Sequence, residues 1–230
     1  MLSEVDFSTF DYISLSDQDD IWFKDKLTSC IEKMTNENAD ACSSDVVAFW
    51  GDEAATSKKK YIQKSQMIGK WNHHFESAGP GCTFVIKNKV AEELKLFLIA
   101  NAANLPSLAL HDWLIFSFAI SRRFKWVILP KATILYRQHA TNVIGANTGL
   151  KSYLKRVNLL KSGWYLSQVS LISDLCGNSN KPPILQIKEL TFKNLIFILK
   201  NMRHMRRKLT DRLVLATFFI YLFFSHPRTK

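Results

Sequence analysis

The sequence predicts an α/β protein: a mixed sheet flanked by helices, followed by a helical, basic C-terminal region. Two observations predict this class. Short β-branched and aromatic runs alternate with helical periodicity in the first part of the chain, whereas only helical periodicity remains from about residue 149 onward. The basic side chains also concentrate in that second part. We therefore predict two regions, residues 1–148 and residues 149–230.

The elements of the first region follow from residue type and spacing. Six short apolar runs have the length and composition of strands: residues 11–15, 46–50, 74–77, 82–86, 125–129 and 132–136. Three segments carry apolar residues at helical spacing: residues 24–34, 88–99 and 110–121. In the first helix Leu27, Ile31 and Met34 define the expected buried face, and Asn88 is the expected cap of the second. The polar stretch 51–60 is expected to be a loop.

The second region is expected to contain helices only, over residues 151–175, 187–209 and 210–224, with a break at 177–183. Its longest apolar run, residues 213–224, would cover less than about 20 Å as a helix, which is short of the roughly 30 Å hydrocarbon thickness of a bilayer. This run could enter a bilayer or pack in a core, but we do not expect it to span a membrane.

Charge divides the chain unevenly. Residues 1–150 hold 16 basic and 17 acidic side chains, whereas residues 151–230 hold 15 and 3. The second region is also rich in apolar residues, which favours binding to a membrane surface, with Met202 and Met205 of the basic segment 200–208 on the lipid side. The alternative is that these helices pack on the sheet. A pI of about 9.5 alone suggests nucleic acid, but no nucleic-acid-binding motif accompanies it, so we expect no such partner.

The four cysteines have no CxxC spacing, which argues against a zinc site or a disulfide framework and for a reducing compartment. The first residues include Glu4 and Asp6 instead of a basic and then apolar run, so no signal peptide is expected. We therefore expect a cytoplasmic protein at the inner face of the plasma membrane.

An acidic cluster follows the first predicted strand. Asp17, Asp19 and Asp20 stand in SDQDDIW, where they repel one another unless they face water or a cation gathers them. Carboxylate oxygens suit Mg²⁺ or Mn²⁺, which a nucleotide-sugar diphosphate needs as its leaving group gains charge. A solvated turn with Asp20 capping the next helix explains the cluster equally well.

Three further motifs are weak when taken separately. Gly79 and Gly81, in ESAGPGCTFVI, permit close approach of a ligand but also suit an ordinary turn. Asp112, in HDW at the start of an apolar helix, could be a general base, or it could simply interact with the helix dipole. His139, in ILYRQHATNVIGA, could bind a metal or a phosphate, although a single histidine at a strand end is more often without such a role.

In their order along the chain, these four motifs resemble the bacterial family-2 glycosyltransferases, and most closely the rhamnosyltransferase-like members of O-antigen and other surface polysaccharide pathways. The resemblance covers roughly residues 10–146. It implies a partial GT-A (Rossmann-like) sheet and an inverting transfer of a sugar, with rhamnose implied by the subgroup. The donor would be a nucleotide-diphosphate sugar and the acceptor a lipid-linked glycan.

The resemblance also implies roles for single positions. Asp17 and Asp19 match the Asp-x-Asp motif that binds Mg²⁺ or Mn²⁺, and His139 matches a histidine that helps to hold the metal. Asp112 matches the catalytic base. The remaining matched positions would line the donor and acceptor site: Asp20, Trp22, Gly79, Pro80, Gly81, His111, Trp113 and Arg137.

One departure from the family pattern bears on activity. Only ten residues precede the first matched strand, and the family's strands for the nucleotide base and ribose have no counterpart here. We therefore expect a chain truncated at its N-terminus, with weak or no activity by itself, or one that works with a separately encoded N-terminal half. The alternatives to an enzyme are an inactive remnant and a basic protein that binds membrane surfaces.

Overall fold

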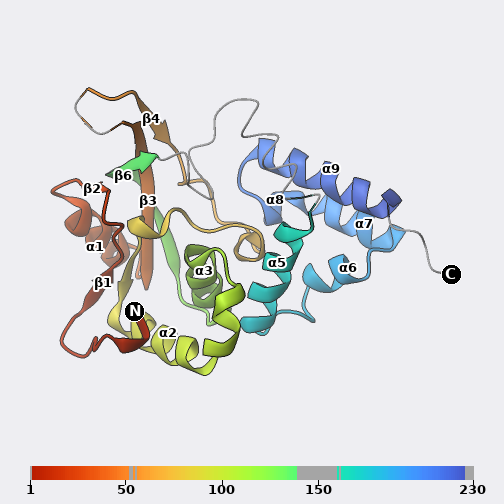
Figure 1. Cartoon of the computed structure of the whole chain (residues 1–230), viewed down its shortest axis with the longest axis horizontal. Coiled ribbons are helices and arrows are strands. Elements are labelled where there is room, and N and C mark those ends of the chain that lie inside the picture. Colours follow the sequence, from red (N-terminus) through yellow and green to blue (C-terminus); the bar gives the residue numbers. More distant parts are fainter. Residues whose placement is uncertain (1, 52–53, 55, 139–159, 161, 226–230) are drawn as a thin grey trace.

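A computed structural model describes residues 2–51, 54, 56–138, 160 and 162–225 (Figure 1). Within them the chain forms a six-stranded mixed sheet. Its strands are β1 (Tyr12–Ser14), β2 (Ile21–Trp22), β3 (Ala41–Trp50), β4 (Lys59–Ile62), β5 (Val85–Lys87) and β6 (Trp126–Gln138). The predicted α/β class and the mixed sheet are confirmed, and the architecture is consistent with a partial GT-A fold.

The order of the strands is β1-β5-β3-β6-β2, and β4 adds to the outer half of β3. The central pair β3 and β6 runs parallel, whereas every other pairing is antiparallel. β3 is buried on both faces, and its polar residues are therefore paired: Ser44 Oγ lies 2.6 Å from Thr133 Oγ1, and Ser43 accepts a hydrogen bond from Trp126.

Helices cover both faces of the sheet (Figure 1). Alternate residues of a strand point to opposite faces, so Cys42 packs with α1 (Lys26–Asn36), while Ala41 joins the core formed by α2 (Asn88–Ala100) and α3 (His111–Ser121). Short 3₁₀ turns complete this part of the chain: η1 (Leu2–Glu4), η2 (Asn72–His74), η3 (Gly81–Thr83) and η4 (Ala102–Ser107).

The three predicted helices of this region are present, but two details differ. The face that α1 buries contains Lys26, Cys30 and Met34, whereas Leu27 is 42% exposed. Asn88 does not cap α2; its side-chain amide donates to the carbonyls of Phe7 and Phe10 and thereby holds the N-terminal segment.

The structure corrects one predicted strand, joins two others and adds a strand at the end of a predicted loop. Residues 74–77 follow a 3₁₀ turn and form no strand. The two runs around Pro130 form the single strand β6. A bulge shifts the register of β6 against β3 at this point, so the sheet does not require the N–H that proline lacks. Within the predicted loop 51–60, the polar residues from Lys59 onward begin the edge strand β4.

The described part of the second region is helical, as predicted. It contains α5 (Trp164–Leu175), α6 (Ile184–Lys188), α7 (Phe192–Lys200), α8 (Met202–Met205) and α9 (Leu209–Ser225), with a break at 177–183. Its apolar residues share one core with α2 and α3. The predicted boundary between residues 148 and 149 lies outside the described residues.

The predicted membrane contacts of this region need one correction. Met202 and Met205 are buried in the shared core, so they do not face lipid. Among the described helices none has both the length and the apolar character required to cross a bilayer.

Two adjacent buried histidines in the 3₁₀ turn η2 predict an acid-sensitive fold. His73 and His74 are buried, their rings lie 3.9 Å apart, and burial lowers their pKa values to about 3 and about 4. Both must therefore remain neutral in the folded chain, whereas in the unfolded chain each binds a proton below about pH 6.5. Stability should be full above that pH and should fall as the pH decreases, by about 2 kcal/mol per histidine at pH 5.

Urea denaturation at pH 7.5 and pH 5 measures this loss. His73→Asn should flatten the pH dependence of the free energy of unfolding, because it removes one titrating group. An identical pH dependence in wild type and His73→Asn would contradict the assignment.

Candidate active site

A cleft of about 520 Å³ opens at one end of the sheet. Its walls come from segments far apart in sequence: the loop after β1, residues 64–66, residues 75–81, the start of α3, Tyr136 of β6 and residues 206–211. All four predicted motifs contribute to this one cleft, through Asp17, the loop of Gly79 and Gly81, Asp112, and Tyr136.

The acidic loop and the glycine loop meet at a group of potential metal ligands. The ligand atoms of Asp17, Asp20 and Cys82 all lie within 4.8 Å of one another. Asp20 Oδ1 accepts a hydrogen bond of 2.9 Å from the Arg137 amide, whereas its buried Oδ2 has no hydrogen bond of normal geometry among the described residues. Burial raises the pKa of Asp20. An orphaned, buried carboxylate oxygen beside a second carboxylate fits a bound cation.

Asp19 and Arg137, both predicted site residues, contact each other instead. Arg137 Nε donates to the Asp19 carbonyl at 3.1 Å, and its Nη1 donates to the Gly51 carbonyl at 2.7 Å. The guanidinium also lies over the Phe49 ring. Arg137 thus fixes the acidic loop against the sheet. A metal-binding role for Asp19 stays a prediction, and Asp20 is the residue grouped with Asp17.

A buried lysine lies beneath the acidic loop. Lys26 Nζ donates to the carbonyl of Cys82 at 2.7 Å and lies 3.3 Å from the centre of the Trp22 ring. Burial lowers the pKa of Lys26 to about 8, while the nearby carboxylates of Asp17 and Asp20 act in the opposite direction. Lys26 therefore supplies positive charge below the carboxylates, and the Trp22 ring covers its amine. A ligand-binding role for Trp22 stays a prediction.

The glycine loop approaches the start of α3 closely. A Cβ added at Gly81 would lie 3.3 Å from His111 Nε2 and 3.4 Å from Asp112 Cβ. Pro80 precedes the turn, and its carbonyl accepts a hydrogen bond from Thr83. The small residue at position 81 thus lets the loop lie against the HDW motif.

Asp112 is the carboxylate best placed for proton transfer. Its Oδ1 accepts a hydrogen bond of 2.7 Å from the Trp113 amide at the start of α3. Burial raises the pKa of Asp112 and the Asp17 charge adds to this rise, while His111 and Lys64 oppose it. A carboxylate with a raised pKa at the edge of a cleft suits a general base.

Trp113 serves the packing of this site. Its indole N–H donates to the His73 carbonyl at 2.7 Å, and its ring stacks on Tyr165. The side chain is 2% exposed, so it supports the start of α3 from the core.

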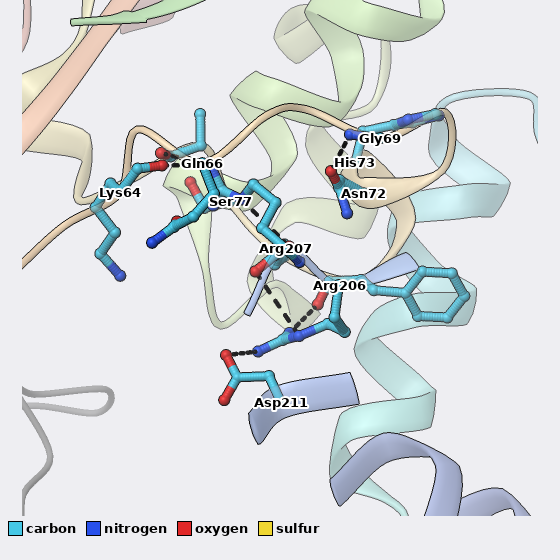
Figure 2. Close-up of polar contacts among 12 residues, drawn as sticks. Lys64, Gln66, Gly69, Asn72, His73, Ser77, Arg206, Arg207 and Asp211 are labelled. Carbon is cyan, nitrogen blue, oxygen red and sulfur yellow. Dashed lines mark hydrogen bonds and ion pairs between the residues drawn. The ribbon is translucent and has the colours of Figure 1, made fainter. Parts of the chain in front are cut away.

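Another wall of the cleft is formed by residues 206–211, at the junction of α8 and α9. Figure 2 shows the polar contacts of Arg206 and Arg207 in this segment. Arg206 contacts Asp211 at 3.2 Å and donates to the Phe75 carbonyl, and Arg207 contacts Glu76 at 3.2 Å. The Arg207 guanidinium also donates to carbonyls of the loop before and within the glycine motif, which are those of Lys64, Ser77 and Ala78. This Arg206–Arg207 clamp explains why the basic segment is not free to lie on a membrane through these two cations.

Residues 64–66 on the same wall are positioned by Asp45 of β3. Its carboxylate accepts hydrogen bonds from the amides of Lys64 and Ser65 and from the hydroxyl of Tyr61. Asp45 is 1% exposed and therefore uses its charge to fix the chain after β4.

The structure thus gathers Asp17, Gly79, Pro80, Gly81, His111, Asp112 and Trp113 around the cleft, with Asp20 beside Asp17. His139 lies outside the described residues, so its predicted pairing with Asp19 at a metal stays a prediction. Sequence reasoning missed Lys26, Asp45, Lys64, Cys82 and the clamp residues. Of these, Cys82 lies inside the ESAGPGCTFVI motif, whereas no local sequence pattern indicated a role in the cleft for the others.

The cleft thus brings together a carboxylate cluster, a glycine loop and a partly buried aspartate at one side of a mixed sheet. No protein-family model matches the chain. It is 39% identical over 180 residues to the "dTDP-rhamnosyl transferase RfbG" of Shigella flexneri. The match covers 78% of this chain and 61% of that relative. The predicted resemblance to rhamnosyltransferase-like glycosyltransferases is thereby confirmed.

Proposed function

We propose that this chain carries the acceptor and catalytic side of an inverting glycosyltransferase, which moves rhamnose from dTDP-rhamnose to a growing surface glycan such as O-antigen. The observation that carries the proposal is the position of Asp112 in the same cleft as Asp17 and the glycine loop. The similarity to a dTDP-rhamnosyl transferase of Shigella flexneri supports the choice of donor.

In the proposed reaction the Asp112 carboxylate takes the proton from an acceptor hydroxyl. The oxygen attacks the anomeric carbon as the bond to the nucleoside diphosphate breaks, so a single displacement inverts the configuration. The raised pKa of Asp112 matches this role, because a stronger base removes the hydroxyl proton more readily. His111 Nε2 lies against the glycine loop, close to where the acceptor would pass.

We further propose that Asp17 and Asp20 hold Mg²⁺ or Mn²⁺, with His139 as a further ligand. Their ligand atoms are close enough for one ion, and Asp20 Oδ2 is buried without a hydrogen bond of normal geometry. Such an ion would offset negative charge on the departing diphosphate. Lys26 would hold the two loops in register through the Cys82 carbonyl.

The lipid-linked acceptor and the peripheral membrane location are also part of the proposal. The exposed face of α9 carries large apolar side chains, namely Leu209, Leu213, Ile220 and Phe224. An apolar row on a helix in a strongly basic region suits the surface of an anionic membrane.

Metal binding and transfer test the proposal together. For Asp17→Asn and Asp20→Asn we expect the Kd for Mn²⁺, measured by electron paramagnetic resonance, to rise at least about tenfold, because each removes a charged ligand. Rhamnose transfer from dTDP-rhamnose should decrease in parallel. Asp11→Asn, at an exposed position, is the matched control and should change neither.

Unchanged Mn²⁺ binding in both variants would contradict the metal site. Rhamnose transfer at the wild-type rate in both variants would contradict the catalytic proposal. Normal Mn²⁺ binding without any transfer would favour the alternative of a folded chain that does not transfer.

A further inference from the structure

One wall of the cleft carries positive charge that the fold leaves uncompensated. Four cations line it, but Arg206 and Arg207 are engaged in the clamp described above. The amines of Lys64 and Lys208 have no hydrogen bond or ion pair within the described residues. Figure 2 shows the Lys64 side chain extending away from the clamp contacts. This wall therefore offers two cations to a ligand.

Local electrostatics support an anion at this wall. Burial and the neighbouring cations Arg207 and Lys208 lower the pKa of Lys64 to about 8. The N-terminus of α9, a helix of 17 residues, reaches the same wall through Thr210, and the helix dipole adds positive potential there. A bound anion would relieve this repulsion.

The two sides of the cleft have opposite character, and Asp112 is influenced by both. Asp17 raises the pKa of Asp112, whereas Lys64 lowers it. Lys64 follows β4 and Lys208 precedes α9, whereas Asp17 and Asp20 belong to the segment between β1 and β2. Different segments of the chain thus supply the cations and the carboxylates of the cleft, and a separate anion position beside Lys64 is part of the inference.

The surface next to this wall is apolar. Leu209 and Leu213 follow Lys208 directly along α9 and are 66% and 61% exposed. A ligand that carries both a phosphate group and a hydrocarbon chain could place the phosphate between the two lysines and the chain along α9.

We propose that Lys64 and Lys208 bind the phosphate group of a lipid diphosphate, the anchor of the acceptor glycan. This inference rests on the proposed function, since it assigns the acceptor's anchor to the wall opposite the acidic loop. The same phosphate chemistry is present in the nucleoside diphosphate of the donor, so the test must separate the two sources.

Isothermal titration calorimetry of the full chain with two probes distinguishes binding of a lipid diphosphate from binding of the donor's nucleoside diphosphate. The probes are farnesyl diphosphate, a soluble lipid diphosphate, and dTDP with Mn²⁺, both at about 0.15 M salt so that diffuse attraction is screened. For Lys64→Gln and for Lys208→Gln we expect the Kd for farnesyl diphosphate to rise about tenfold, because each loses one charge-assisted contact. The Kd for dTDP should change less than about twofold. Lys60→Gln removes one exposed charge from β4 and should have no effect on either probe.

Three results would overturn the proposal. If both variants bind farnesyl diphosphate as tightly as the wild type, the lysines do not form the site. If affinity for dTDP falls by the same factor, the lysines bind the donor. If Lys60→Gln weakens farnesyl diphosphate binding equally, the effect comes from net charge alone. Thermal unfolding of each variant checks that the fold is retained. Because the readout is binding, a chain that binds farnesyl diphosphate as expected but transfers no rhamnose would refute only the proposed function.

Discussion

Asp112→Asn is expected to lower kcat for rhamnose transfer by about 10³-fold, within the range that general-base catalysis supplies. Asparagine has the same shape and retains an oxygen to accept the hydrogen bond from the Trp113 amide, so the start of α3 should keep its geometry. What it cannot do is take a proton from the acceptor. KM for the donor should change little, because Asp112 acts on the other reactant.

The pH profile of the wild type provides a second readout. Burial raises the pKa of Asp112, so the carboxylate becomes protonated, and therefore inactive as a base, at a higher pH than an exposed aspartate. Activity should consequently decrease on the acidic side as the pH falls through that raised pKa. In Asp112→Asn this limb of the profile should disappear from the residual activity.

Glu32→Gln, at an exposed position on α1, is the matched control for loss of one carboxylate. Full kcat in Asp112→Asn, or an unchanged acidic limb, would remove Asp112 from the mechanism. In that case the resemblance that identified it would not extend to the chemistry.

Arg207→Met is expected to destabilise the folded chain by about 3–5 kcal/mol, the usual loss when one partner of a buried ion pair is removed. Arg207 is 6% exposed, and its guanidinium contacts Glu76 and three backbone carbonyls of the loop that leads into the glycine motif. Methionine fills a similar volume but removes the guanidinium donors of these carbonyls and the cation nearest to Glu76, which keeps only the backbone amide of residue 207 and the more distant Arg206. Urea denaturation at neutral pH measures the difference in the free energy of unfolding.

A double variant separates charge from packing. Glu76→Gln in the Arg207→Met background removes the carboxylate that has lost its nearest cation, so part of the lost stability should return. Lys193→Met removes an exposed cation from α7 and should change stability by less than about 0.5 kcal/mol. A loss below about 1 kcal/mol in Arg207→Met would show that the clamp contributes little to the fold.

Local patterns predicted the elements that depend on local chemistry. The helices α1, α2 and α3 were found from apolar spacing, and β1 from a short apolar run. β4 was missed because an edge strand keeps one side open to water, so its Lys59 and Lys60 read as a loop. The buried face of α1 was misassigned because it includes Lys26, a cation that tertiary contacts to carbonyls make tolerable in the core.

The candidate site divides in the same way. Asp17, Gly81 and Asp112 were named from motifs and meet at one cleft. The grouping of Asp20 with Cys82 could not be derived, since it depends on how two loops fold against each other. The wall formed by residues 206–211 could not be predicted either, because Arg206 and Arg207 contact residues 75 and 76, about 130 positions earlier in the chain. No periodicity links positions so far apart.

That distance has a consequence for biosynthesis. Asp17 and Asp211 both line the cleft, so a growing polypeptide on the ribosome cannot complete the cleft until the start of α9 has emerged. Until then the glycine loop lacks the guanidinium groups that tether it, and its carbonyls remain hydrated. Competence to hold a substrate should therefore arrive late during translation, well after the sheet itself has been made.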